Sequence, residues 1–269
     1  SDVCSSDLTK IPIANQRFWK FEGRQNRTMR PDQVIPNSKV SDTFQKIFNF
    51  SLYKPDQLQL FLEQTEHKFV QPKKTDILLF IKFYDPAKSQ LRYVGHVLAD
   101  LSDTLLDLIP LMNKMAGIPE DTSIQAYEEV RPTMIETIHP KRTLEFCELQ
   151  SGDIVCFQAQ QQKTSSDSSD NTTTTTTHTY PTAKDYYSYL VYRKDIKIVK
   201  HGDKPDKFTS IELLRNWPFV KVVKAIGTAL NIDHEKIRLY GYNPYNNCPR
   251  TDPFKSSEVL SLKDMLFSH

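Results

Sequence analysis

A low-complexity tract near the middle of the chain limits how the rest can fold. From Gln160 to Thr179 the residues are almost all Gln, Ser, Asp and Thr, including an unbroken run from Thr172 to Thr177. Such a segment carries too little apolar surface to offset the entropy lost on ordering, so we expect a flexible linker over residues 160–183. The 269 residues therefore divide into separate modules rather than sharing one core.

The residues before this tract have the pattern of a small sheet covered by a single helix. Apolar runs predict strands, and the turn composition from Asp85 to Ser89 predicts that the first two form a hairpin. Apolar residues recur at helical spacing over 105–116, behind Ser102 and Asp103, which are candidate N-cap residues. The expected strands are 76–84, 90–99, 123–129, 134–138 and 153–158. One helix covering the one apolar face of such a sheet is an α+β, ubiquitin-like β-grasp module.

Similar elements are expected in the rest of the chain. The sequence of Ile124–Tyr127 is echoed by Ile237–Tyr240, which indicates an internal duplication and a second strand of this kind. Ser1–Leu8 are small and polar, and we exclude them from the fold. The other expected elements are strands at 16–21, 57–63 and 195–199 and helices at 186–192 and 219–230. The predicted division is a partial first ubiquitin-like module at 1–64, the second at 65–159, the linker at 160–183, and a third module at 184–269 that stops before completing.

Charge and cysteine content exclude several classes of partner and compartment. Lys and Arg number 35 against 33 Asp and Glu, so the net charge of +2 gives no strong field for nucleic acid or an anionic membrane. No apolar run approaches the roughly 20 residues that span a bilayer, and no secretory signal is present. Four scattered cysteines fit reduced thiols. We expect no nucleic-acid or membrane partner, and a location in the nucleus and cytoplasm.

The sequence offers two cysteine and histidine pairs that a hydrolase could use. These are Cys147 with His139 and Cys248 with His234, but neither cysteine lies at a Gly-rich or capped helix start that would lower its pKa. Ordinary module cysteines are the favoured interpretation, and Cys156 is expected in the core. We therefore assign no catalytic residue, with a cysteine hydrolase using Cys147 or Cys248 as the alternative.

No cofactor is expected. The histidines are dispersed and no two cysteines have the spacing of a metal-ligand pair, so we assign no metal. The seven glycines form no phosphate-binding loop. Arg24, Arg27 and Arg30 lie in a polar loop that could hold phosphates, although a solvated basic surface is favoured.

Acidic residues gather at two places that a β-grasp fold can bring together. Glu128 and Glu129 end one expected strand, while Glu145, Glu148 and Asp153 surround the start of the last one. Together they would form an acidic patch that attracts Lys- or Arg-rich peptides. The alternative is a plain hydrophilic rim.

Several ordered blocks of sequence carry a resemblance to a known family. The blocks are Arg17-Phe18-Trp19-Lys20, Arg24-Gln25-Asn26-Arg27-Thr28, Leu60-Phe61-Leu62-Glu63, Asp76-Ile77-Leu78-Leu79-Phe80, Leu91-Arg92-Tyr93-Val94-Gly95, Tyr127-Glu128-Glu129-Val130 and Gly152-Asp153-Ile154-Val155-Cys156-Phe157-Gln158. They resemble the C-terminal region of the herpesvirus-associated ubiquitin-specific proteases, the ubiquitin carboxyl-terminal hydrolase 7 type, and its plant members in particular.

The resemblance implies a role for the region and for its acidic residues. In that family, tandem ubiquitin-like domains follow the catalytic domain, recruit substrates and tune the hydrolase. The family's acidic docking surface matches Glu148 and Asp153 here, with Glu128 and Glu129 as further contributors. Cys147 and Ser151 stand where animal members carry more acidic residues, and the family's catalytic Cys and His boxes do not occur in this chain.

From the residues and the resemblance together, we predict a substrate-docking and regulatory region of a cysteine-type deubiquitinase. The predicted partners are basic peptide segments of client proteins and the catalytic domain of the same polypeptide. A structural spacer with no partner is a further alternative.

Overall fold

The computed structural model describes residues 9–36, 59–65, 70–160, 180–243, 245–246, 248–255 and 260–267. These fall into two compact units, Ser1–Tyr186 and Tyr187–His269. The first two predicted modules share one unit, so the boundary between them stays a prediction. Residues 161–179 of the expected linker, and the excluded Ser1–Leu8, lie outside the described residues.

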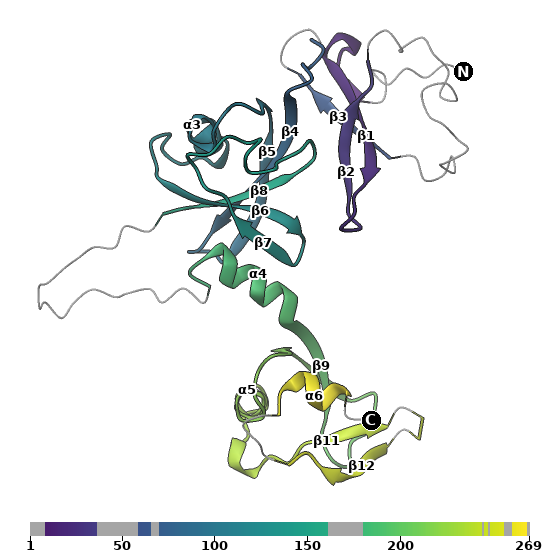
Figure 1. Ribbon diagram of the computed structural model, residues 1–269. Coiled ribbons are helices and arrows are strands. Elements are labelled where there is room, and N and C mark those ends of the chain that lie inside the picture. Colours follow the sequence, from purple (N-terminus) through teal and green to yellow (C-terminus); the bar gives the residue numbers. More distant parts are fainter. Residues whose placement is uncertain are drawn as a thin grey trace, which may run out of the picture. The chain divides into compact units, whose positions relative to one another are not determined.

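A five-stranded sheet with one helix forms the centre of the first unit (Figure 1). The strand order is β5-β4-β8-β6-β7, and β4 and β8 run parallel in the middle. The elements are β4 (Asp76–Asp85), β5 (Gln90–Asp100), α3 (Leu105–Ala116), β6 (Ile124–Arg131), β7 (Met134–Thr137) and β8 (Ile154–Ala159). A hairpin, a helix and a returning parallel strand make up the β-grasp, so the predicted α+β, ubiquitin-like fold is confirmed.

The helix α3 covers one face of this sheet. Leu105, Leu108 and Met112 point from the helix into a core shared with alternate strand residues such as Leu79 and Phe157. The predicted N-cap is wrong by one or two residues, because Thr104 is the cap. Asp103 instead accepts a hydrogen bond from the Asp100 amide at 2.9 Å, which closes the turn before the helix.

A three-stranded antiparallel sheet precedes this module, in the order β2-β1-β3. It is called the first sheet below, and the five-stranded sheet is called the second sheet. The first sheet consists of β1 (Gln16–Gly23), β2 (Met29–Val34) and β3 (Leu60–Gln64), after a 3-10 turn at Ile13–Asn15. The strand predicted at 16–21 is present as part of β1. The strand predicted at 57–63 is present from Leu60 onward, and residues 57–58 lie outside the described residues. The expected polar loop is shorter than predicted, because β2 begins at Met29. Pro31 lies within β2, where it is tolerated because β2 is an edge strand.

The helix α4 (Ala183–Tyr192) spans the division between the units and continues directly into β9. The other elements of the second unit are β9 (Arg193–Val199), β10 (Phe208–Leu214), α5 (Phe219–Leu230), a 3-10 turn (His234–Lys236), β11 (Tyr240–Asn243), β12 (Cys248–Pro253) and α6 (Leu262–Phe267). They form two hairpins, β9 with β10 and β11 with β12. The prediction of a strand at Ile237–Tyr240 is wrong for its first three residues. A 3-10 turn occupies His234–Lys236, and β11 begins only at Tyr240.

The second unit has its own small core. Leu213, Val222, Ile226 and Leu262 are buried together, which places α5 against β10 and the start of α6. No helix in the described ranges is long and apolar enough to cross a bilayer.

Candidate functional site

The four carboxylates predicted to form a docking patch lie in three different environments. Asp153 and Glu129 are buried, Glu128 is partly buried, and Glu148 is exposed. The structure brings Glu128 and Asp153 to the same face of the sheet, whereas the side chain of Glu129 lies on the opposite face. Whether these residues bind a partner stays a prediction.

Asp153 lies immediately before β8 and is held by contacts on both of its carboxylate oxygens. Its Oδ2 accepts a hydrogen bond from the Gln150 amide at 2.8 Å, which closes the turn before the strand. Its Oδ1 pairs with Nη1 of Arg24 at 2.8 Å. Burial raises the pKa of Asp153, while the Gln150 amide and Arg24 act in the opposite direction.

Glu129 is occupied on the other face of the sheet. Consecutive residues of a strand point to opposite faces, so the side chain of Glu129 leaves that of Glu128 and turns toward β4. There its Oε2 lies 2.5 Å from Nζ of Lys82, and only 3% of Glu129 is exposed. Glu129 therefore lies on the other face of the sheet from Glu128 and Asp153, in an ion pair with Lys82.

Glu128 has the most unusual surroundings of the four. Its cross-strand neighbour on β7 is Glu136, and like charges directly opposite each other destabilise a sheet. Burial first, and then the charges of Asp153 and Glu136, raise the pKa of Glu128 to about 7. Arg24 and Arg30 lower it, but not enough to cancel those effects.

Glu148 lies on the turn that leads to Asp153. Its backbone adopts the left-handed region at φ 58°, and its amide donates to the Glu145 carbonyl at 2.9 Å. This turn is fixed to the sheet through Ser151, whose Oγ accepts from the Leu78 amide at 3.2 Å. Glu148 is thus an exposed acidic side chain on a well-anchored turn.

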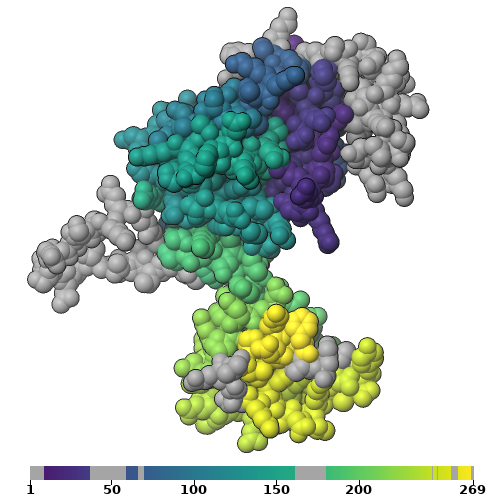
Figure 2. Space-filling model, in the orientation of Figure 1, coloured from purple at the N-terminus to yellow at the C-terminus, as the bar shows by residue number. Residues whose placement is uncertain are grey.

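Arginines of the first sheet complete the site, and they were not predicted to belong to it. The first sheet, purple in Figure 2, lies against the teal second sheet, and residues of the turn between β1 and β2 form hydrogen bonds to it. Arg24 donates from Nη2 to the Ser151 carbonyl at 2.5 Å, Asn26 donates to the Val130 carbonyl at 2.9 Å, and Arg30 donates to the Glu129 carbonyl at 3.1 Å. The predicted solvated basic surface is therefore wrong for Arg24 and Arg30, which are partly buried; Arg27 is exposed.

The two sheets approach closely beside Gly152. This glycine has φ 87°, and a Cβ atom added to it would lie 2.4 Å from the Pro31 carbonyl oxygen and 2.8 Å from Cβ of Arg30. Only glycine fits both the conformation and the space. The site consequently contains residues of both sheets, and Asp32 on β2 also influences the pKa of Asp153.

The cysteines form no hydrolase site in the described part of the chain. Cys156 is fully buried, as predicted, while Cys147 is partly buried and Cys248 is exposed. Neither Cys147 nor Cys248 is hydrogen-bonded to a histidine among the described residues. No three His, Cys, Asp or Glu side chains in those residues are grouped to hold a metal ion.

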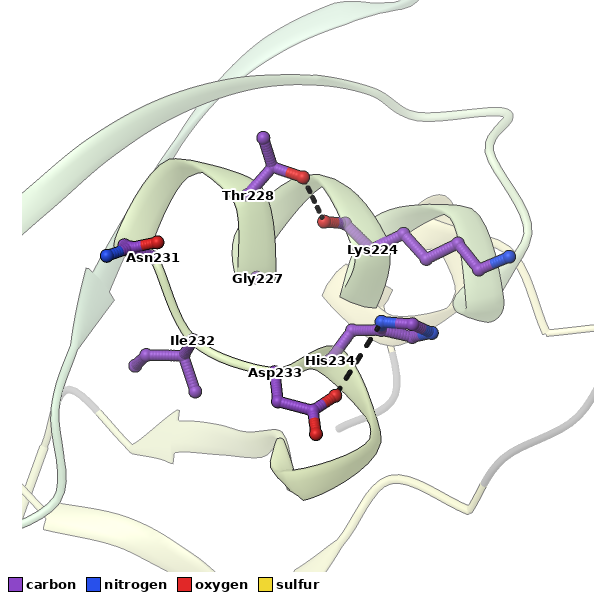
Figure 3. Close-up of a pocket in the computed structure, with 7 residues that line it drawn as sticks. All are labelled: Lys224, Gly227, Thr228, Asn231, Ile232, Asp233 and His234. Atoms are coloured by element: carbon purple, nitrogen blue, oxygen red, sulfur yellow. Dashed lines mark hydrogen bonds and ion pairs between the residues drawn. The ribbon is translucent and has the colours of Figure 1, made fainter.

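A pocket of about 350 Å³ lies at the C-terminal end of α5 (Figure 3). Its lining is Lys224, Gly227, Thr228, Asn231, Ile232, Asp233 and His234. Nδ1 of His234 is 3.9 Å from a carboxylate oxygen of Asp233, and no cysteine contributes to the lining. The pocket therefore lacks the nucleophile that a cysteine hydrolase built on His234 would need.

Comparisons with known proteins identify similar sequences. A family model described as the ICP0-binding domain of ubiquitin-specific protease 7 matches residues 16–266. Ubiquitin C-terminal hydrolases 13 and 12 of Arabidopsis thaliana are 32% and 30% identical in alignments of length 268 that cover 95% of this chain and 23% of each relative. Ubiquitin carboxyl-terminal hydrolase 7 of Drosophila melanogaster is 27% identical over 171 residues, 62% of this chain and 14% of the relative. The chain thus spans about a quarter of its plant relatives.

Among solved structures, the C-terminal ubiquitin-like domain of mouse tubulin-specific chaperone e aligns at 15% identity with a TM-score of 0.27. The alignment covers 34% of this chain and 93% of that domain.

Proposed function

The chain belongs to the family of the ICP0-binding domain of ubiquitin-specific protease 7, and from that premise we propose that it is a non-catalytic docking and regulatory region of a deubiquitinating enzyme. In this proposal a thiol protease domain elsewhere in the same polypeptide removes ubiquitin. Two observations support it. The plant relatives are named as ubiquitin hydrolases and are about four times longer than the match. Cys147 and Cys248 have no histidine partner among the described residues.

The docking surface proposed here is the carboxylate cluster of Asp32, Glu128, Glu136 and Asp153. The observation that carries the proposal is the cross-strand pair of Glu128 and Glu136, which places two acidic side chains directly opposite each other at the edge of the sheet. Within this cluster four carboxylates face two arginines, Arg24 and Arg30. A cationic side chain from a partner would relieve the repulsion, and it would favour the ionised form of Glu128.

The partner class that fits is a Lys- or Arg-rich segment of a client protein. Such a segment supplies charge-assisted hydrogen bonds to the carboxylates, and the exposed Glu148 on the neighbouring turn would add long-range attraction. Holding a client by this segment raises its effective concentration at the catalytic domain. Glu129 is not part of this cluster, because its side chain lies on the opposite face of the sheet, where it pairs with Lys82.

The proposal is tested by measuring peptide affinity in the full chain. The probe is a fluorescent peptide rich in Arg and Lys, and its counterpart carries Gln at the same positions. At pH 8, where most Glu128 is ionised, we expect Glu128→Gln with Glu136→Gln to weaken binding of the basic peptide about five- to tenfold. Fluorescence anisotropy gives the dissociation constants, and affinity should fall as salt is added.

The matched control is Glu120→Gln with Asp121→Asn. These two exposed residues lie in the loop between α3 and β6, so the control removes the same charge from another part of the module. It should bind the basic peptide within about twofold of the wild type, as expected for a distant exposed pair. Equal loss in both variants, or no preference of the wild type for the basic peptide, would refute the proposal and leave a structural spacer.

A further inference from the structure

The carboxylate cluster already holds a basic ligand that belongs to the chain itself. Arg24 comes from the turn between β1 and β2, 127 residues away in sequence from Ser151, whose carbonyl it contacts. Its guanidinium binds in two places, with Nη1 at 2.8 Å from Asp153 Oδ1 and Nη2 at 2.5 Å from the Ser151 carbonyl oxygen. An arginine of a bound peptide would form the same ion pair with the Asp153 carboxylate.

Arg24 is also the more accessible partner of this ion pair. The exposed fraction of its side chain is 20%, against 6% for Asp153. Part of the Arg24 side chain is therefore in contact with solvent, whereas Asp153 is almost fully covered. A rotation about the side-chain bonds of Arg24 would take its guanidinium away from the Asp153 carboxylate.

The first sheet makes other contacts with the second sheet besides those of Arg24. Asn26 and Arg30 donate hydrogen bonds to backbone carbonyls of β6, and these bonds need no carboxylate. On β3, the ring of Phe61 packs edge-on against Phe80 of β4, with the centroids 5.0 Å apart. Release of Arg24 is therefore a side-chain event that leaves the two sheets docked.

From this arrangement we propose that Arg24 is a competitor built into the chain, which a basic client segment must displace from Asp153 before it can bind there. The inference rests on the proposed docking function and adds its regulation. Only molecules in which Arg24 has left the carboxylate can bind the client there. The apparent affinity of the site is therefore the intrinsic affinity multiplied by the fraction of such molecules. Client binding and occupancy by Arg24 are then mutually exclusive.

The test compares three single variants of the full chain with the wild type, using the basic peptide and its Gln counterpart. Arg24→Gln removes the competitor and should bind the basic peptide about three- to tenfold more tightly. Arg27→Gln removes the same charge from the exposed side of the same turn and should stay within about twofold of the wild type. Arg24→Lys keeps the charge but loses the two-point contact, so its affinity should fall between those of the wild type and Arg24→Gln.

A second measurement follows the competitor directly. The arginine side-chain NMR signal of Arg24 should change on addition of the basic peptide, whereas that of Arg17, which pairs with Glu63 at 3.2 Å, should not. Thermal unfolding of each variant reports whether the fold is kept, and Arg24→Lys provides the comparison if Arg24→Gln is unstable.

The outcomes separate the two proposals. Binding of the basic peptide by the wild type, with tighter binding by Arg24→Gln than by Arg27→Gln, supports the competitor. Binding by the wild type with equal or weaker binding by Arg24→Gln would overturn the competitor and leave the docking function standing. No binding by any variant would overturn both.

Discussion

At the scale of single residues, Glu128 is the carboxylate whose surroundings change its pKa most within the proposed docking surface. Its pKa is raised from 4.5 to about 7, first by burial and then by Asp153 and Glu136. Between these two values the folded chain holds a proton that the unfolded chain has released. The contribution of Glu128 to stability is therefore complete below about pH 4.5 and is lost as the pH rises toward 7.

Replacing Glu128 with Gln removes this ionisation, and the stability of the variant should no longer fall over that range. We compare the free energies of unfolding of Glu128→Gln and of the wild type at each pH. From pH 5 to pH 8, the difference between them should change by about 1–3 kcal/mol in favour of the variant, allowing for the partial exposure of the side chain. Calorimetric unfolding at a series of pH values measures the difference. The exposed Glu120→Gln serves as the control and should follow the wild type, and a constant difference between Glu128→Gln and the wild type would contradict the prediction.

Sequence alone identified part of this site. The acidic character of Glu128, Glu148 and Asp153 is visible in the sequence, as is the β-grasp order that brings Glu128 and Asp153 to one face. The pairing of Asp153 with Arg24 is not, because it joins two sheets across a long stretch of chain. The repulsion between Glu128 and Glu136 could have been found, since a hairpin of β6 and β7 with a short turn places them opposite each other.

At the scale of elements, three helices in the described part of the chain begin with the same short sequence, a hydroxyl residue followed three positions later by Asp. The pairs are Thr104 with Asp107 in α3, Thr182 with Asp185 in α4, and Ser261 with Asp264 in α6. In α3 the Asp107 carboxylate accepts from the Thr104 amide at 2.8 Å and from its hydroxyl at 2.7 Å. These bonds satisfy polar groups that a helix start leaves unpaired.

Removing the hydroxyl of Thr104 should therefore weaken the start of α3, the helix that covers the second sheet. We expect Thr104→Ala to lower the free energy of unfolding by about 1 kcal/mol. Urea denaturation followed by tryptophan fluorescence measures it, because Trp19 lies buried in the same unit. Ser123→Ala is the control, since its exposed hydroxyl makes no hydrogen bond among the described residues, and an equal loss there would rule out a capping effect.

The elements that sequence predicts well are those with one buried face. The hairpin of β4 and β5 and the helices α3 and α5 show regular apolar spacing, and all were predicted. The strands β10 and β12 were missed, because β12 is exposed along its whole length and β10 buries little beyond Leu213. Such strands have no apolar alternation to reveal them. The edge strand β2 was missed for a related reason, since Pro31 and its charged neighbours are typical of loops.

At the scale of the whole molecule, the two units have separate hydrophobic cores. The core of the first unit includes Leu79 on β4, which is fully buried. In the second unit, Leu213 on β10 is 1% exposed and packs with residues of α5 and α6. Cooperative unfolding follows shared burial, so each core should define its own transition.

Two matched substitutions test this independence. Leu79→Ala and Leu213→Ala each remove the same buried atoms, and each should destabilise its own unit by about 3–5 kcal/mol. Because neither core shares side chains with the other, we expect Leu213→Ala to lower the melting temperature of residues 187–269 alone, and Leu79→Ala that of the first unit alone. Calorimetry of the full chain, with hydrogen exchange to assign each transition, measures both. If either variant shifted both transitions equally, the units would unfold as one, and a client docked on the first unit would also stabilise the second.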